Sequence, residues 1–137
     1  MNLQTHKILE TVNTNTILNE IEHLLKPNDD HVWLQKMHDF VYDFSYTNNL
    51  LLKYNMYNTR IMYLKPYQCY TWHRDQTPRI HIPLTTNDKC KFIVEDVCFN
   101  LLIDNMYWVD TTKYHSAFNG NKDFDRYHIV GLTDELV

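Results

Sequence analysis

The second half of the chain is a succession of short apolar and aromatic segments, and this pattern limits the possible folds more than any other feature. From Thr59 onward about eight segments rich in Ile, Val, Tyr, Phe and Trp follow one another, separated by turn residues. They read RIMYL, CYTWHRD, RIHIPLTT, CKFIVED, VCFNLLI, MYWVD, YHSAFN and RYHIVGL. The pattern predicts a β-sandwich or barrel with flanking helices, of which the jelly roll is one form.

Two helices are expected ahead of these strands. Residues 14–25 carry apolar side chains at helical spacing, and Pro27 follows as a stop. Residues 32–44 repeat this spacing after an Asn-Asp-Asp sequence that suits a helix cap, so the second helix is expected to end near Phe44. At 137 residues we expect one domain, with residues 1–58 as a helical segment packed on a core formed by residues 59–137.

Charge and composition exclude several classes of function. The net charge of −4 and the pI near 6.0 give no general reason to bind nucleic acid or an anionic membrane. No apolar run is long enough to span a bilayer or to serve as a signal peptide, so a cytoplasmic protein is expected. Three cysteines without C-x-x-C spacing argue against a disulfide framework or zinc knuckle. Two glycines are too few for a glycine-rich phosphate loop.

Two of the predicted strands carry the same Arg-x-His pattern. Side chains alternate between the faces of a strand, so Arg79 and His81 share one face, and Arg126 and His128 share another. The simplest interpretation is a half-solvated sheet whose polar residues face water. Two such strands in a chain with only four arginines favour a shared polar pocket, in which the planar guanidinium binds a carboxylate through two hydrogen bonds.

A possible metal site lies beside the first of these strands. His73 and Asp75 are two residues apart on an extended segment, so both side chains point the same way. His115, on a later strand, is the candidate third ligand. Two histidines and one carboxylate on one side of a metal leave the opposite positions open, the arrangement that suits non-haem Fe(II). A lone H-x-D sequence is common by chance, and it gains weight only from the distal His and Arg.

At these residues the chain resembles the Fe(II)/2-oxoglutarate-dependent dioxygenases. The resemblance covers roughly residues 60–134 and follows the family order of H-x-D, distal His and an Arg about ten residues later, here Arg126. Within this superfamily the chain looks most like the aspartyl/asparaginyl β-hydroxylase group, whose R-x-H-x-x-L segment matches RIHIPL. It departs from that group at Asp75, where members commonly have Gly and only two protein ligands.

The resemblance implies a double-stranded β-helix core, that is, a cupin-like jelly roll, and a set of roles for the residues above. Fe(II), 2-oxoglutarate and O2 would be the cofactors, and the catalytic iron ligands would be His73, Asp75 and His115. Arg126 would form a salt bridge with the C5 carboxylate of 2-oxoglutarate, and Arg79 and His81 would be further contacts to the cosubstrate.

Two more residues are candidate cosubstrate contacts with strong alternatives. Tyr63 lies ten residues before His73, like a strand tyrosine of the prolyl hydroxylase relatives, yet a core or rim role is the more common one for a tyrosine. His128 shares a strand face with Arg126, and a hydrogen-bonded core histidine explains it equally well.

The function implied is that of a hydroxylase of an amino acid of the Asp, Asn or Pro type, free or in a peptide, with decarboxylation of 2-oxoglutarate to succinate. Its partners would be a small-molecule or peptide substrate, with no nucleic acid and no membrane. The alternative is a cupin-like, non-catalytic module that binds a metal or a small acid. A third hypothesis, an interaction domain with incidental histidines, predicts that the three candidate ligands lie far apart.

Overall fold

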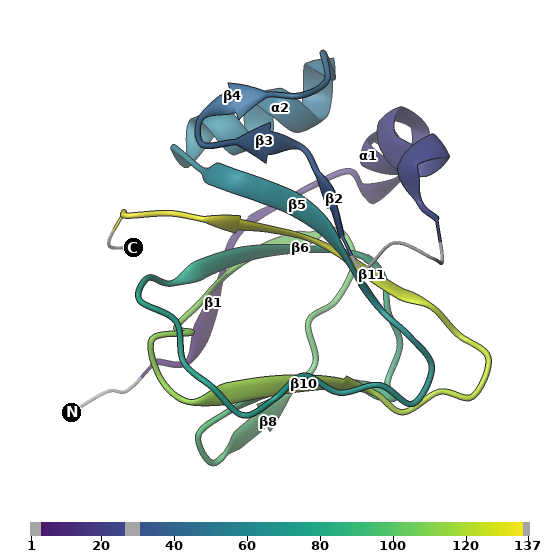
Figure 1. Cartoon of the computed structure of the whole chain (residues 1–137), viewed down its shortest axis with the longest axis vertical. Helices are drawn as coiled ribbons and strands as arrows, with labels where there is room; N and C mark the ends of the chain where they lie inside the picture. The colour runs from purple at the N-terminus through teal and green to yellow at the C-terminus, as the bar shows by residue number, and fades with distance from the viewer. Residues whose placement is uncertain (1–3, 27–30, 136–137) are drawn as a thin grey trace.

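The computed structural model describes residues 4–26 and 31–135, which form two antiparallel sheets facing each other (Figure 1). The larger sheet has six strands in the order β1 (His6–Thr11), β9 (Asn105–Val109), β6 (Arg79–Thr85), β11 (Arg126–Leu132), β5 (Tyr57–Leu64) and β2 (His31–Trp33). The smaller sheet has the order β10 (His115–Asn119), β7 (Cys90–Val94) and β8 (Val97–Phe99). This is the two-sheet arrangement of a jelly roll.

The helices cover the outer face of the larger sheet (Figure 1). They are α1 (Thr14–Ile21), which continues into the 3-10 turn η1 (Glu22–Leu24), and α2 (Ser45–Lys53). Between them the chain forms β2 and a small hairpin of β3 (Gln35–Lys36) and β4 (Asp39–Phe40). Among the described residues, no helix is both long and apolar enough to cross a membrane.

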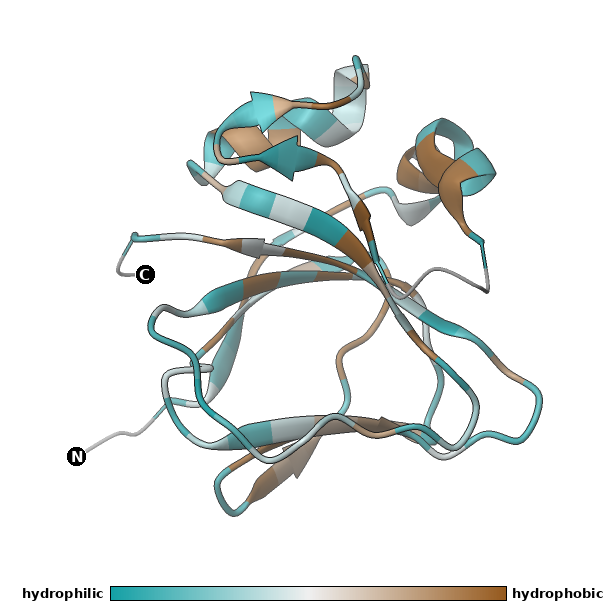
Figure 2. Cartoon of the chain, in the orientation of Figure 1, coloured by the Kyte–Doolittle hydropathy of each residue, from teal (hydrophilic) through white to brown (hydrophobic). Residues whose placement is uncertain are grey.

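The alternation of side chains along the central strands divides the core in two. Figure 2 shows hydrophilic and hydrophobic residues alternating along β6. Ile80 and Ile82 point outward and pack with Ile17 of α1 and Leu51 of α2 in a core between the larger sheet and the helices. Each such buried side chain contributes roughly 1.5–3 kcal/mol to stability. The inward-facing residues of the same strands are therefore left to line the space between the sheets.

A smaller apolar cluster fills part of that space. It joins the two sheets through seven buried residues: Leu64, Phe92, Val94, Leu101, Tyr107, Val109 and Ala117. Because this cluster does not fill the whole interior, the polar residues of β6 and β11 can line a cavity beside it.

The prediction for the N-terminal segment is correct for the first helix and wrong for the second. Residues 32–44, expected to be helical, form β2 and the β3–β4 hairpin, and Met37 has the positive φ of 53° that a tight turn requires. The second helix, α2, begins only at Ser45. The segment also supplies β1 and β2, which lie at the two edges of the larger sheet. The N-terminal 58 residues therefore take part in the sheet as well as covering it.

One predicted strand is a loop. The segment CYTWHRD lies in the connection between β5 and β6, and it pairs with β10 through isolated bridges from Cys69 to Phe118 and from His73 to His115. Together with the hydrogen bond from the amide of Tyr70 to the carbonyl of Ala117 at 2.9 Å, these bridges hold the loop along β10. His73 and Asp75, two of the candidate metal ligands, therefore lie on a loop that is fixed to β10.

Candidate metal centre

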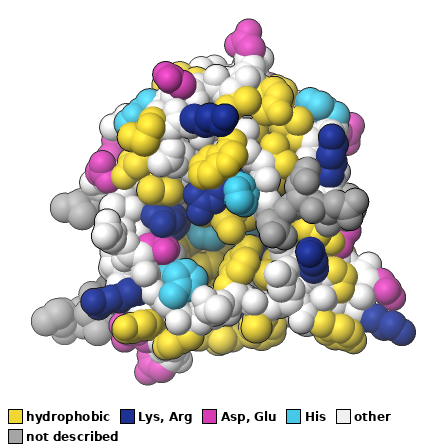
Figure 3. Space-filling model, in the orientation of Figure 1, with side chains coloured by type: hydrophobic (Ala, Val, Ile, Leu, Met, Phe, Trp, Pro, Cys, Tyr) yellow, Lys and Arg dark blue, Asp and Glu magenta, His cyan; other side chains and the backbone are white. Residues whose placement is uncertain are grey.

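A cavity of about 420 Å³ opens between the two sheets. Figure 3 shows it as a hollow on one face of the molecule, with histidine, basic and acidic side chains gathered around it. Its lining residues come from β5, β6, β7, β10, β11, the loop before β6 and the loop between β9 and β10, and they are Arg60, Met62, Cys69, Tyr70, Thr71, His73, Asp75, Arg79, His81, Phe92, Thr111, His115 and Val130.

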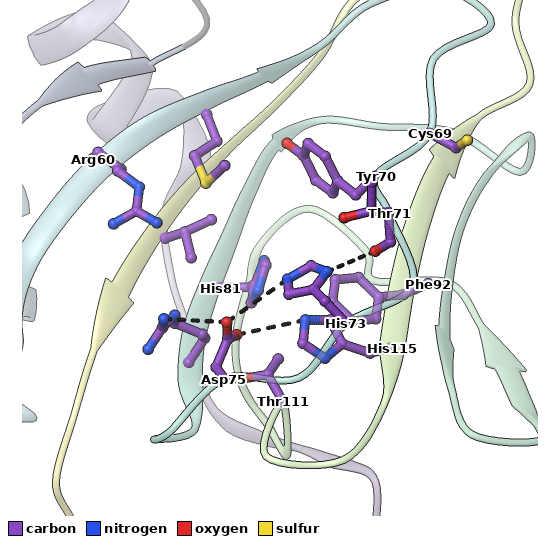
Figure 4. A pocket seen from close by; sticks show the side chains of 13 residues that line it. Arg60, Cys69, Tyr70, Thr71, His73, Asp75, His81, Phe92, Thr111 and His115 are labelled. Atoms are coloured by element: carbon purple, nitrogen blue, oxygen red, sulfur yellow. Dashed lines mark hydrogen bonds and ion pairs between the residues drawn. The ribbon is translucent and has the colours of Figure 1, made fainter.

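The structure brings the three predicted metal ligands together (Figure 4). One ligand atom from each of His73, Asp75 and His115 lies within 4.8 Å of the others. Backbone hydrogen bonds hold this arrangement: the amide of His115 donates to the carbonyl of His73 at 2.8 Å, and the amide of Asp75 donates to the carbonyl of Thr111 at 2.8 Å. The loop and β10 therefore position the three side chains through their main chains.

The hydrogen bonds of the two imidazoles leave the same nitrogen of each ring free. Nδ1 of His73 lies 2.6 Å from the carbonyl oxygen of Thr71, and Nδ1 of His115 lies 2.9 Å from that of Lys113. A carbonyl oxygen only accepts, so both Nδ1 atoms must carry the proton. Each neutral ring then presents the lone pair of Nε2, which is the form that binds a metal.

These lone pairs face a carboxylate, which is unfavourable unless a positive charge lies between them. Nε2 of His73 is 3.7 Å from Oδ1 of Asp75, and Nε2 of His115 is 3.5 Å from Oδ2. A proton on each ring could supply the charge, but burial lowers the pKa of His115 and so disfavours its imidazolium form. A metal ion satisfies all three groups at once, so the donor set fits Fe(II) or a similar cation.

Arg79 and Arg60 are the two arginines that line the cavity. Nη2 of Arg79 lies 3.4 Å from Oδ1 of Asp75, and its Nη1 donates to the side-chain hydroxyl of Thr77 at 3.0 Å. Arg60 lies across the cavity and stacks over the ring of Trp33, with 5.3 Å from the guanidinium carbon to the ring centroid. The cavity therefore holds two positive charges, one beside Asp75 and one across from it.

Arg126 is buried behind the cavity, with 3% of its surface exposed. Its Nη2 donates to the hydroxyl of Tyr70 at 3.3 Å, and Tyr70 in turn lines the cavity. Its Nε has no hydrogen-bond partner, and no carboxylate in residues 4–26 and 31–135 pairs with it. Burial lowers the pKa of this guanidinium, but an arginine remains charged in a protein. An unpaired buried cation of this kind favours the binding of an anion.

His81 and His128 form a buried pair between Arg126 and the metal centre. Their Nδ1 atoms are 3.1 Å apart, so one ring must donate to the other. Burial, followed by the charge of Arg126, holds the pKa of both rings well below the ordinary value, and both are therefore neutral near pH 7. His81 lines the cavity, whereas His128 lines only a small void of about 10 Å³ that it shares with Arg126.

Tyr63, unlike Arg126 and His128 behind the cavity, lies on the opposite side of the larger sheet from it. It lies on the outer face of β5, where its ring stacks on Tyr127 at 4.9 Å and its hydroxyl donates to Asp125 at 2.6 Å. Met62, its neighbour in the chain, points inward instead. Of the two roles considered for Tyr63, its position therefore fits the core role.

Sequence reasoning missed several polar residues that line the cavity, among them Arg60 and Tyr70. A signal for Arg60 was present, because it alternates with Ile61 and so shares the face of Met62. Tyr70 lies on the loop, where no strand periodicity indicates a direction. Its role became visible only through its contact with Arg126.

Comparisons with known proteins agree with this geometry. The family model of the aspartyl/asparaginyl β-hydroxylases matches residues 32–131. No curated protein sequence matches the chain.

Solved structures of several proteins share its fold, and three of them follow. A viral collagen prolyl hydroxylase from Paramecium bursaria Chlorella virus-1, solved with 2-oxoglutarate, has a TM-score of 0.65 at 12% identity over 95% of this chain and 96% of its own. A prolyl-4-hydroxylase from Pseudomonas putida has a TM-score of 0.64 at 8% identity over 98% and 95%. A cupin-2 domain protein from Shewanella frigidimarina has a TM-score of 0.54 at 13% identity over 89% and 93%. The predicted double-stranded β-helix is confirmed.

Proposed function

The chain belongs to the aspartyl/asparaginyl β-hydroxylase family, and on this premise we propose that it hydroxylates an amino acid, either free or within a peptide, at the centre formed by His73, Asp75 and His115. The enzyme class is that of a 2-oxoglutarate-dependent hydroxylase, with Fe(II), 2-oxoglutarate and O2 as cofactors. The proposal adds to this class the ligand set, the contacts to the cosubstrate and the conversion of 2-oxoglutarate to succinate.

One observation carries the proposal. Two imidazoles and a carboxylate bring one ligand atom each within 4.8 Å of the others, and both Nδ1 protons are committed to backbone carbonyls. Three ligands on one side of a metal leave the opposite side open for the cosubstrate and dioxygen. Asp75 makes this set complete, in contrast to family members that have Gly at the corresponding position.

The residues around the centre suit a five-carbon dicarboxylate. Arg126, buried and without a carboxylate partner among the described residues, would bind the C5 carboxylate, and Tyr70 lies between it and the cavity. Arg79 and the neutral His81 line the cavity nearer to the metal ligands and would contact the cosubstrate there. His128 would keep His81 in one orientation through the bond between their Nδ1 atoms.

The bound cofactors and the residues of the chain contribute different parts of the chemistry. When bound, Fe(II), 2-oxoglutarate and O2 supply the oxidative decarboxylation and the hydroxylation of a C–H bond. The chain holds the metal ligands in register through the bridge between His73 and His115, and it supplies fixed positive charge through Arg79 and Arg126. Phe92, Met62 and Val130 form the apolar part of the wall and reduce the access of water.

The test is an anaerobic titration of the purified protein with Fe(II) and 2-oxoglutarate, followed by an assay for succinate in air with ascorbate. We expect binding of both and a slow release of succinate without substrate, and we expect His115→Ala to abolish it. His38→Ala, which alters an exposed histidine, is the matched control and should behave as wild type. A protein that binds neither ligand would refute the proposal. Binding of both without turnover would favour the cupin-like binding module.

A further inference from the structure

Arg60 lies in the cavity wall opposite the metal centre, and neither the metal nor the cosubstrate accounts for it (Figure 4). Its Nη1 donates to the backbone carbonyl of Asn58 at 3.3 Å, and its guanidinium stacks over Trp33. No carboxylate within ion-pair distance is found for it in the part of the chain that the structure describes. Arg60 is thus a half-buried cation facing a cavity.

The electrostatics of the cavity show that Arg60 lacks a counter-charge. Burial and then the charge of Arg79 lower the pKa of Arg60, and Asp75 only partly opposes them. The two guanidinium groups therefore repel each other, and the single carboxylate of the cavity pairs at 3.4 Å with Arg79. An anion placed near Arg60 would remove this imbalance.

Binding of the metal and the cosubstrate does not supply the negative charge that Arg60 lacks. Fe(II) brings two positive charges and 2-oxoglutarate brings two negative ones, so together they do not change the net charge. In the proposed arrangement Asp75 binds the metal, while Arg79 and Arg126 contact the cosubstrate. Arg60 then remains as the cavity-lining arginine without a partner, and the substrate is the one component not yet placed.

We propose that Arg60 binds a carboxylate group of the substrate and so selects an anionic substrate over its neutral analogue. This inference rests on the proposed function, which defines the cavity as the place of hydroxylation. The stack on Trp33 holds the planar guanidinium in one orientation, so little side-chain entropy is lost when a carboxylate binds through two parallel hydrogen bonds. A lysine at this position would keep the positive charge but could not form the two parallel hydrogen bonds with a carboxylate.

Two sources present this chemistry: the α-carboxylate of a free amino acid and the side-chain carboxylate of an acidic residue in a peptide. They are distinguished by two matched pairs of probes. The first pair is L-proline and L-prolinamide. The second pair is N-acetyl-L-aspartate N-methylamide and N-acetyl-L-asparagine N-methylamide, which differ only in the side-chain acid.

The experiment is isothermal titration of each probe into the protein loaded with Mn(II) and 2-oxoglutarate, so that binding is measured without turnover. We expect the acid of one pair to bind at least about tenfold more tightly than its amide, because a charge-assisted hydrogen bond is lost in the amide. The pair that shows the difference identifies the source of the carboxylate. Arg60→Gln should abolish the difference, and Arg60→Lys should restore part of it.

Arg74→Gln is the matched control, since Arg74 is exposed and contacts the ring of Tyr114 outside the cavity. It should keep the preference of the wild type. A wild type without preference in either pair, or an Arg60→Gln protein that retains the preference, would overturn the inference while leaving the hydroxylase proposal intact. A protein that fails to bind Mn(II) or 2-oxoglutarate would instead contradict the proposed function and remove the premise of this inference.

Discussion

Among single residues, Arg126 is the clearest case of an unfavourable environment, because its charge is buried without a counter-ion in the part of the chain that the structure describes. Its guanidinium is buried, its Nε is unpaired, and the hydroxyl of Tyr70 is its one hydrogen-bond partner among the described side chains. Burying a charge without a counter-ion destabilises a protein. Such a residue is explained if the missing counter-ion is a ligand.

Arg126→Met is therefore expected to act in opposite directions on stability and on binding. Removing the unpaired charge should raise the free energy of unfolding of the ligand-free protein by on the order of 1 kcal/mol. The dissociation constant of 2-oxoglutarate should rise by about 30-fold or more, because one partner of a buried charge pair is lost. Urea denaturation and calorimetric titration measure the two effects. Unchanged affinity for 2-oxoglutarate would show that Arg126 does not bind its carboxylate.

The buried pair of His81 and His128 predicts how stability depends on pH. Both pKa values are lowered in the folded state, chiefly by burial, whereas an unfolded histidine titrates near 6.5. Below about pH 6.5 the unfolded chain takes up protons that the folded pair does not, so stability falls as the pH falls. Each ring contributes up to about 1.4 kcal/mol per pH unit in this range.

The measurement is the urea midpoint of the metal-free protein between about pH 7.5 and pH 5. It should be nearly constant above about pH 7 and should decrease below 6.5. His128→Leu should show a shallower decrease, because one of the two rings no longer titrates. An identical pH dependence in the two proteins would contradict the assignment of a neutral buried pair.

At the level of elements, α2 depends on a cap from another helix. Its N-cap residue, Phe44, has no side-chain hydrogen bond to the helix. The carboxylate of Glu20, in α1, instead accepts hydrogen bonds from the amides of Tyr46 and Thr47 at 2.9 and 2.8 Å and from the hydroxyl of Thr47. Burial raises the pKa of Glu20, but these donors outweigh it and the net shift is downward.

Glu20→Ala is accordingly expected to lower the free energy of unfolding by about 1–2 kcal/mol, since two amides at the start of α2 lose their acceptor. Glu22→Ala, an exposed change in the adjoining turn, should stay within about 0.5 kcal/mol of wild type. Chemical denaturation at neutral pH measures both. The difference should shrink as the pH falls through the lowered pKa of Glu20. Equal stability of the two variants would show that α2 does not need this cap.

The second helix was predicted at the wrong residues, in part because the cap of the true helix comes from a distant part of the chain. The spacing of Val32, Phe40 and Val41 is helical, but the residues form short strands around a turn at Met37. The true helix, SYTNNLLLK, has a weak apolar pattern, and its cap lies 26 residues away from Tyr46 in the chain. Local sequence carries no sign of such a contact. The strand β1 was missed for a similar reason, because it pairs with β9 about a hundred residues later.

Strand alternation, in contrast, was enough to assign the faces of β6. Ile80 and Ile82 lie in the outer core, and Arg79 and His81 line the cavity, as the period of two predicts. At Tyr63 the same alternation agrees with the core role, one of the two roles considered for it, and not with a contact to the cosubstrate. A shift of one residue on a strand moves a side chain to the opposite face. The convergence of His73, Asp75 and His115 depends on a loop lying along β10, which no local pattern specifies.

At the scale of the whole molecule, the cavity lies between two sheets that contribute different groups to it. The larger sheet supplies Arg60, Arg79 and His81 from β5 and β6, and the smaller sheet supplies His115 and holds the loop that carries His73. A metal bound to the histidines and a dicarboxylate bound to the arginines would therefore connect the two sheets. Ligand binding should stabilise the fold as a whole.

This coupling predicts a cooperative thermal shift. A ligand that binds only the folded protein, at about 100 times its dissociation constant, adds about 2.7 kcal/mol. For a domain of 137 residues this corresponds to a rise in Tm of roughly 10 °C. Mn(II) and 2-oxoglutarate together should give more than the sum of their separate shifts, because each increases the affinity for the other. Scanning calorimetry with each ligand alone and with both measures this.

One substitution on each sheet tests how the metal and the cosubstrate each contribute to the rise in Tm. His115→Ala should lose the response to Mn(II), and with it most of the response to 2-oxoglutarate, because the metal would no longer be there to bind the cosubstrate. Arg126→Met should keep the response to Mn(II) and lose the added shift from 2-oxoglutarate, since the larger sheet would no longer hold the carboxylate. Strictly additive shifts in the wild type would mean that the two ligands bind independently, which is incompatible with one shared site between the sheets.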